Sequence, residues 1–330
     1  MIDRRLFLAG AGAALSAALP APAIAAVSVT TQLQWIKDVQ NAGWWLADAD
    51  GYFRDAGIAP TFLAGGPNVS NVEAIVAAGR ADVGVDLLER IVDANAHGED
   101  FVIIGALYQH DPGALMSLPA RPIRTARDIL GKRIGVQQGG RLYVDAILRL
   151  NHLPPDYTEV VVGFDPEPLV DGACDAFLSF LTNEPLTLAA RHIPTVVATF
   201  NALGYETYTD ALFCTRDYLT KNRDTLVRYM RALQRGWSAN VRDPVRGAHL
   251  AATVYGSALG LDETVQVAVN RAQIPLMQSA ATRAHGPMWV DPARVAGPIY
   301  RTLRATGRTS LPPVDRLVDT TILRDAARAR

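Results

Sequence analysis

The stretch from Leu33 to Pro67 limits the possible folds of this chain more than any other part of the sequence. A β-branched apolar run ends at Leu33-Gln34-Trp35 and a polar turn follows. A helix-length segment then closes at Gly57, where a left-handed C-cap favours a residue without Cβ. A short strand over Ile58 to Leu63 runs into the glycine loop Gly65-Gly66-Pro67. This order predicts an open α/β sheet with both loops at the carboxyl ends of strands, where small ligands bind.

The alternation of strands and helices continues beyond this stretch. Ser70 and Glu73 are spaced as a capping box for a helix that ends at Gly79. Short buried strands are predicted over 81–86 and 101–107, on either side of a helix over 87–98. The βαβαβαβ order predicts a parallel sheet with helices on its faces.

A second α/β module follows a polar break at residues 109–113. Its predicted strands lie over 133–136, 159–162, 176–180 and 194–199, and a later strand over 212–215 precedes a mostly helical remainder. Two α/β modules joined by two crossing strands, near 109–118 and 205–215, have the plan of a bilobal clamshell that binds its ligand between the lobes. We assign 26–110 and 210–330 to lobe I and 111–209 to lobe II.

The N-terminus has the pattern of an export signal. Arg4 and Arg5 precede an apolar run rich in Ala and Gly, and Ala23-Ile24-Ala25 offers a small-x-small cleavage site. This pattern predicts a Tat-type signal peptide over 1–25, cleaved after Ala25, and a periplasmic mature protein. A membrane anchor is the alternative, but prolines interrupt the apolar run.

Composition excludes several classes of function. The formal net charge is −1 and there is no basic run, so we expect no nucleic-acid partner and a monomer. Cys174 and Cys214 lie inside apolar runs, which favours buried free thiols over a disulfide. The histidines lack the spacing of zinc motifs, and no nucleophile elbow or P-loop is present. We therefore expect no metal, no cofactor and no catalytic residues.

Several motifs together resemble one family. They are Leu33-Gln34-Trp35 with Gln40-Asn41-Ala42-Gly43, the glycine loop Gly65-Gly66-Pro67, Asp128-Ile129-Leu130-Gly131-Lys132, Thr182-Asn183-Glu184-Pro185, and Tyr208 with Asp210-Ala211-Leu212-Phe213. In this order they resemble substrate-binding proteins of ABC importers, in the branch named for thiamine-pyrimidine synthesis. The resemblance implies a type II periplasmic binding fold and delivery of a small heteroaromatic solute to an ABC permease in the inner membrane. The solute it implies first is a thiamine pyrimidine precursor, such as a hydroxymethyl- or formylaminopyrimidine.

The same resemblance leaves alternatives open. Other members of the wider group bind riboflavin or alkanesulfonates, and a solute sensor that docks on a membrane receptor would share the pattern. One eukaryotic branch is an enzyme that makes the pyrimidine phosphate, with a lysine and a histidine after the first motif and a cysteine-rich iron motif. This chain has Ile36 and Asn41 at the first two positions, lacks the cysteine cluster and carries the export signal. We therefore expect a binding protein rather than an enzyme.

The candidate ligand contacts come from loops that follow predicted strands. Trp35 can stack on a flat ring, amide groups suit the edge of a heterocycle, and an acid at a strand end can accept its N–H groups. The structural alternatives are a core tryptophan, helix caps and tight turns. The candidates are Trp35, Gln40, Asn41, Gly66, Pro67, Asp86, Gly140, Arg141, Asn183, Glu184, Tyr208 and Asp210.

Overall fold

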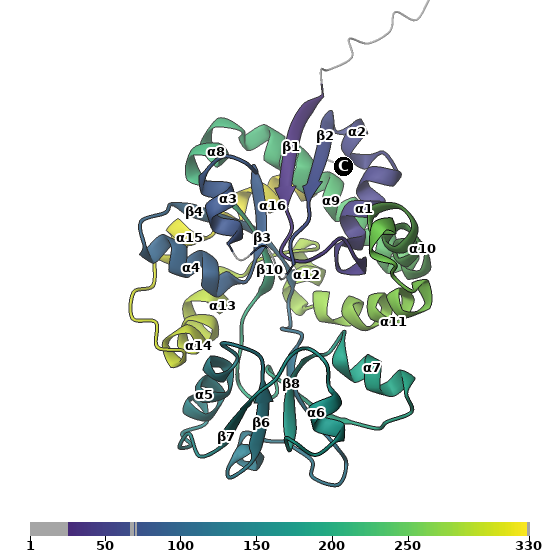
Figure 1. Cartoon of the computed structure of the whole chain (residues 1–330). Helices are drawn as coiled ribbons and strands as arrows, with labels where there is room; N and C mark the ends of the chain where they lie inside the picture. Colours follow the sequence, from purple (N-terminus) through teal and green to yellow (C-terminus); the bar gives the residue numbers. More distant parts are fainter. Residues whose placement is uncertain (1–25, 67–68, 70, 329–330) are drawn as a thin grey trace, which may run out of the picture.

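The computed structural model describes residues 26–66, 69 and 71–328. The predicted signal peptide, Ser70 and the candidate Pro67 lie outside the described residues. The described part forms two five-stranded sheets, ordered β2-β1-β3-β10-β4 and β7-β6-β8-β5-β9. Figure 1 shows them as two lobes, and the α/β two-lobed fold is confirmed. We keep the name lobe I for the part with the first sheet and lobe II for the part with the second; the residue borders proposed above stay a prediction.

The strands of lobe I are β1 Val27–Gln32, β2 Ile58–Leu63, β3 Val83–Asp86, β4 Phe101–Tyr108 and β10 Thr209–Thr215. Those of lobe II are β5 Gly113–Ser117, β6 Arg133–Val136, β7 Thr158–Val161, β8 Ala176–Phe180 and β9 Val196–Thr199. In lobe I, β1 pairs in parallel with β2 and β3, and β10 inserts antiparallel between β3 and β4. The carboxyl ends of the parallel strands therefore share one edge of the sheet.

The helices before the return to lobe I are α1 Ala42–Ala49, α2 Tyr52–Asp55, α3 Val72–Ala77, α4 Leu88–Ala96, α5 Arg141–Leu150, α6 Glu167–Val170 and α7 Glu184–Ala190. Those after it are α8 Arg216–Lys221, α9 Arg223–Arg242, α10 Pro244–Leu250, α11 Glu263–Gln273, α12 Ala280–His285, α13 Pro292–Arg294, α14 Tyr300–Ala305, α15 Val314–Leu317 and α16 Thr321–Arg328. Short 3-10 or π turns lie at Val39–Asn41, Ala126–Ile129, Ala251–Tyr255, Ser257–Leu259, Ile274–Met277 and Val295–Ile299. Within the described ranges, no helix has the length and apolar character that a bilayer span requires.

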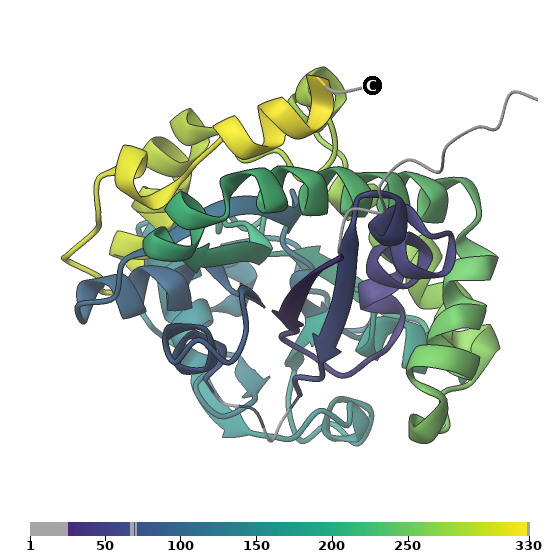
Figure 2. The same cartoon turned by 90° about the horizontal axis from the view of Figure 1, so that it is seen from above.

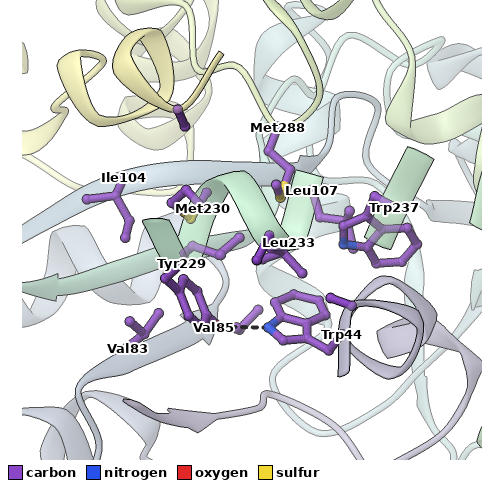
Figure 3. Packing of buried hydrophobic residues seen from close by; sticks show 14 of the residues in the cluster. Trp44, Val83, Val85, Ile104, Leu107, Tyr229, Met230, Leu233, Trp237 and Met288 are labelled. Carbon is purple, nitrogen blue, oxygen red and sulfur yellow. Dashed lines mark hydrogen bonds between the residues drawn. The ribbon is translucent and has the colours of Figure 1, made fainter. Parts of the chain in front are cut away.

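The main core of lobe I lies between its sheet and helices α1 and α9. Figure 2 shows α9, in green, running over this part of the lobe. Trp44 donates its indole N–H to the Tyr229 hydroxyl at 2.8 Å and meets Trp237 edge-on, with ring centroids 6.0 Å apart (Figure 3). A Cβ at Gly236 would lie 2.0 Å from the Gly43 carbonyl oxygen, so glycine is required for the close contact of α9 with α1.

Several helix boundaries differ from the prediction. The segment expected to run to Gly57 is two helices, because Gly51 at φ 72 breaks it between α1 and α2. The cap of α3 is Asn71, whose side chain accepts from the Ala74 N–H, rather than the predicted box that begins at Ser70. Cys174 and Cys214 are buried and free, as predicted.

The two lobes are joined by the segments between β4 and β5 and between β9 and β10. Asp111, in the first crossing, links them: its carboxylate accepts from the Gly113 N–H at 2.6 Å and from the Thr209 hydroxyl. Its own N–H donates to the Asn201 side chain in the second crossing at 3.2 Å. One buried carboxylate therefore ties the two crossings to each other.

Candidate functional site

The boundary between the lobes is where loops from both sheets make contact. Trp35, in the loop after β1, meets Phe164, in the loop after β7, with ring centroids 6.3 Å apart and an interplanar angle of 63°. The Tyr143 hydroxyl of α5 donates to Glu89 of α4 at 3.4 Å. These two contacts join lobe I to lobe II at the loop and helix ends that follow the strands, so we take this boundary as the candidate ligand site.

The glycine loop holds the Trp35 loop in place. The Gly65 N–H donates to the Trp35 carbonyl at 2.8 Å, and the Gly66 N–H donates to the Gln34 carbonyl at 3.1 Å. A Cβ at Gly65 would lie 2.2 Å from the Gln34 oxygen. The N–H of the candidate Gly66 is therefore already bonded within the protein, where it helps to hold the loop that carries Trp35.

Polar residues after Trp35 also stabilise this loop. The buried Asn41 amide donates to the Ile36 carbonyl at 3.0 Å, and the Gln40 N–H donates to the Asp38 carboxylate at 2.9 Å. The Trp45 indole donates to the Asp38 carbonyl at 2.8 Å. The Asn41 side chain therefore supports this loop but does not cap α1, which was the alternative that the sequence offered. The Gln40 side chain is half-buried, and ligand binding by both residues stays a prediction.

Asp86 ends β3 and is fully buried. One carboxylate oxygen accepts from the Leu87 N–H at 2.7 Å, and the other lies 3.9 Å from an Arg90 nitrogen. Burial, and next the charge of Glu73, raise the pKa of Asp86 to about 8. The side chain is therefore an acid at a strand end that binds a proton more readily than an ordinary aspartate.

Further acids face the same boundary from different elements. Burial raises the pKa of Asp38 to about 7, and burial together with the charges of Asp38 and Asp111 raises the pKa of Asp210 to about 7. Asp210 has the unusual backbone angle φ 52 at the start of β10. Burial, followed by the charge of Asp111, raises the pKa of Glu89 to about 7. A ligand that donates hydrogen bonds or carries positive charge would stabilise these groups in their ionised form.

The candidates in lobe II are held mainly by their own lobe. Gly140 is the N-cap of α5, and the Arg141 guanidinium pairs with Asp145 and Glu159 at 3.2 Å each. The Glu184 carboxylate accepts from the Phe180 N–H at 2.7 Å and from the Asn183 amide at 3.3 Å, which closes the turn between β8 and α7.

Tyr208 belongs to the second crossing. Its hydroxyl accepts from the Asp291 N–H at 3.1 Å, and the Arg294 guanidinium lies 4.7 Å from the centre of its ring. The structure therefore brings Trp35 to the lobe boundary and holds Arg141, Glu184 and Tyr208 in other contacts. Ligand binding by these four residues stays a prediction.

Five residues at the boundary were missed by the sequence reasoning: Asp111, Phe164, Tyr143, Tyr205 and Glu89. Phe164 stands alone in the polar loop Gly163-Phe164-Asp165 and is 59% exposed, which is a usable signal for a contact residue. Asp111 lies in the polar break that marked the first crossing. Nothing local marks Glu89, Tyr143 or Tyr205, because their importance arises from contacts between distant segments.

Two surface hollows lie elsewhere on lobe I. One, of about 700 Å³, is lined by residues of α2 and α9 that include Arg54, Arg228 and Arg235. The other, of about 570 Å³, lies beside Arg216 and Asp319. Among the residues that the structure describes, no group of three or more His, Cys, Asp or Glu is arranged to hold a metal ion.

A family model described as NMT1/THI5 like matches residues 38–246. The chain belongs to the NMT1/THI5-like family. The matched range begins within the loop that carries Trp35 and ends just after α9, so it includes all of lobe II. The family predicted from the motifs is therefore confirmed.

Curated relatives of this family member are named as enzymes. The 4-amino-5-hydroxymethyl-2-methylpyrimidine phosphate synthase of Schizosaccharomyces pombe is 24% identical over 232 residues, which cover 66% of this chain and 67% of the relative. The synthase of the same name from Legionella pneumophila is 24% identical over 222 residues, covering 66% and 70%. These names contradict the prediction that the chain is not an enzyme. The grounds for that prediction were Ile36 and Asn41 at two positions of the enzyme branch, the missing cysteine motif and the predicted signal peptide, and they were insufficient.

Solved structures show the fold of this NMT1/THI5-like chain. The periplasmic aliphatic sulphonate binding protein SsuA of Escherichia coli superimposes with a TM-score of 0.67 at 14% identity, covering 89% of this chain and 92% of that protein. At this identity the likeness concerns the fold alone. The predicted periplasmic-binding-protein clamshell is therefore confirmed.

Proposed function

We propose that this protein binds a small, flat, nitrogen-rich heterocycle between its lobes and delivers it to an ABC permease in the inner membrane. The solute class that fits first is a thiamine pyrimidine precursor, such as a hydroxymethyl- or formylaminopyrimidine. Export by the segment 1–25 would place the protein in the periplasm, where such a carrier works.

The contact between Trp35 and Phe164 is the observation that carries this proposal. Each ring comes from a loop of a different lobe, and each is at least partly exposed. Two aromatic rings on opposite sides of a hinge can enclose a planar guest, since offset-stacked and edge-to-face arrangements are both favourable. The ring of the guest would replace the direct contact between the two side chains.

Three acids of lobe I, of which Asp86 and Asp210 are buried and Asp38 is half-buried, add a preference for nitrogen. Asp38, Asp86 and Asp210 come from three different elements of lobe I, and each has a raised pKa that burial causes first. The exocyclic amino group of a pyrimidine offers N–H donors to such carboxylates, and its ring nitrogens can accept a hydrogen bond from a protonated carboxyl group. The pyrimidine in the names of the curated relatives supports the same solute class.

Closure about the two crossings supplies a way to signal that the site is filled. Domain closure about a few segment-end residues is the common motion of two-lobed binding proteins. Asp111 ties the crossings through Gly113, Thr209 and Asn201, so it limits how far they separate. A permease that recognises the closed form would then accept only the loaded protein.

A second candidate function is synthesis of the pyrimidine phosphate. The names of the curated relatives favour it directly. The two functions share a pyrimidine site, and they differ in whether the bound molecule leaves changed. Appearance of 4-amino-5-hydroxymethyl-2-methylpyrimidine phosphate in a reaction with the purified protein would support synthesis, and recovery of the unaltered solute would support delivery.

Calorimetry on the mature protein tests the proposed binding. The panel holds a hydroxymethylpyrimidine, a formylaminopyrimidine, riboflavin and an alkanesulfonate, and mass spectrometry identifies any molecule that co-purifies. We expect a pyrimidine to bind with the highest affinity. Preferred binding of the sulfonate, or binding of none of the heteroaromatic compounds, would overturn the proposed solute class.

A further inference from the structure

We propose that Glu89 and Tyr205 bind an amino group of the ligand. With the neighbouring Asp111 and Tyr143 they form a group of side chains called here the acid–tyrosine cluster. The protein would therefore select heterocycles that carry an exocyclic amine over analogues that carry an oxo group, and over sulfonates. This inference rests on the proposed function and names its substrate class more narrowly.

The cluster joins three parts of the molecule. Glu89 lies in the first turn of α4 in lobe I, and Tyr143 lies in the first turn of α5 in lobe II. Their side chains meet at 3.4 Å. Tyr205, from the second crossing, packs edge-on against Tyr143, with ring centroids 5.6 Å apart and an interplanar angle of 71°. A ligand bound between the lobes would reach all three segments at once.

Two polar atoms of the cluster are buried without a partner. Among the described residues, the second carboxylate oxygen of Glu89 and the hydroxyl of Tyr205 make no hydrogen bond. The two residues are only 4% and 1% exposed. Buried polar groups in folded proteins almost always have partners, so each such atom requires an explanation. A hydrogen-bond donor from a ligand would satisfy Glu89.

An amino group matches these two atoms in number and kind. It offers two N–H donors, which a carboxylate oxygen and a tyrosine hydroxyl oxygen can both accept. An oxo group has no donor: it could accept from the Tyr205 hydroxyl, but it would face the Glu89 carboxylate with a lone pair, so the selection depends on Glu89. Burial, and next the charge of Glu89, raise the pKa of Tyr205 well above its ordinary value, so the Tyr205 hydroxyl keeps its proton beside Glu89.

The charges around the cluster oppose an anionic ligand. Arg308 is the cation that influences Glu89, but its guanidinium is held by two bonds of 2.7 Å to Asp93. It also donates to the Thr306 hydroxyl at 2.6 Å. Arg90, whose charge also acts on Tyr143, lies 3.9 Å from the Asp86 carboxylate. Since both guanidinium groups already face carboxylates of the protein, a sulfonate placed here would meet the negative charges of Glu89 and Asp111.

Paired probes in calorimetry test the inference. They are 4-amino-5-hydroxymethyl-2-methylpyrimidine and its analogue with an oxo group at the same ring position. The variants are Glu89→Gln and Tyr205→Phe, which keep the size of each side chain. Glu99→Gln, at an exposed glutamate just after α4, is the matched control. Thermal unfolding of each variant shows that it is folded before binding is measured.

We expect the unchanged protein and the Glu99→Gln variant to prefer the amino probe by about 10- to 100-fold, the range for a hydrogen bond to a charged group. Glu89→Gln should abolish or reverse this preference, because its amide can donate to the oxo group. Tyr205→Phe should weaken binding of the amino probe by about threefold or more, because one acceptor for its N–H groups is lost.

Two results overturn the inference while the proposed function stands. One is equal binding of both probes by the unchanged protein. The other is an equal loss of affinity for both probes in Glu89→Gln, which would show that the Glu89–Tyr143 contact only holds the lobes together. Binding of neither probe by the unchanged protein would instead overturn the proposed function, and the inference with it.

Discussion

Replacement of Trp35 by alanine separates ligand binding from folding in this protein. The Trp35 side chain is half-buried, and its ring contact is with Phe164 of the other lobe. Trp44, nine positions further along, is fully buried and bonded to Tyr229 in the core of lobe I (Figure 3). The pair Trp35→Ala and Trp44→Ala therefore compares a boundary tryptophan with a core tryptophan.

The expected magnitudes differ several-fold. An aromatic pair contributes about 0.5–1.5 kcal/mol, so the loss of the Phe164 contact should cost Trp35→Ala roughly that much in the free energy of unfolding. A buried tryptophan replaced by alanine costs about 3–5 kcal/mol. At about 2–4 °C per kcal/mol for a chain of this size class, Tm falls by a few degrees for Trp35→Ala and by roughly 6–20 °C for Trp44→Ala.

Ligand affinity should show the opposite order. Stacking of a heterocyclic base on an aromatic side chain is worth about 1–3 kcal/mol, so Trp35→Ala should raise Kd by about 5- to 150-fold. Calorimetry with the best pyrimidine of the panel, at a temperature where both variants are folded, measures this change. Trp44→Ala should leave Kd within about threefold, since Trp44 lies in the core and away from the boundary.

The reasoning is refuted if Trp35→Ala unfolds the protein as severely as Trp44→Ala does. It is equally refuted if Trp35→Ala leaves Kd unchanged while the protein stays folded. In the first case Trp35 would be a core residue, and in the second the ligand would bind without it.

Three further predictions follow from buried groups. Asp111→Ala leaves two buried donors of the crossings without their acceptor, and each should lower the free energy of unfolding by about 1–3 kcal/mol. Tm should therefore fall by several degrees. An unchanged Tm would show that the crossings do not depend on this carboxylate. Folding raises the pKa of Asp86 from 3.8 to about 8, so the folded state binds more protons between these values and its stability should fall as pH rises through them. A Tm that is higher at pH 8.5 than at pH 5 would contradict this sign. In the folded protein, neither Cys174 nor Cys214 should react with a thiol reagent, and both should react after unfolding without reductant. Fewer than two reactive thiols in the unfolded protein would reveal a disulfide.

Periodicity and turn residues were sufficient to predict most strands of both lobes, but the prediction of a purely parallel first sheet was wrong. β10 inserts antiparallel between β3 and β4, and β5, expected as a crossing strand, pairs antiparallel with β8 and β9 inside the second sheet. The alternation of short apolar strands with helices carries this information locally, and the polar breaks near Gln109 and before Thr209 mark where the chain leaves one sheet for the other. Helix ends were less predictable. Gly51 separates α1 from α2 because its backbone is left-handed, although one helix was expected there. Asn71 caps α3 in place of the predicted Ser70. The surrounding packing decides both boundaries.

The candidate site was only partly predictable for a physical reason. Trp35 could be found because an aromatic follows a strand end, but its partner Phe164 lies more than a hundred residues away in another lobe. The same holds for Glu89 and Tyr143, whose contact no local pattern encodes. The partners of Arg141 were equally hidden from the sequence: its guanidinium pairs with Asp145 and Glu159, and its predicted ligand contact stays a prediction.

A crystal structure of the mature protein with its tightest-binding pyrimidine tests the account most directly. The account predicts the ring of the ligand against Trp35 at the boundary of the lobes, with an amino group within hydrogen-bond distance of Glu89. Electron density for the ligand in the arginine-lined hollow beside α9, or a Trp35 ring turned away from the bound molecule, would contradict it.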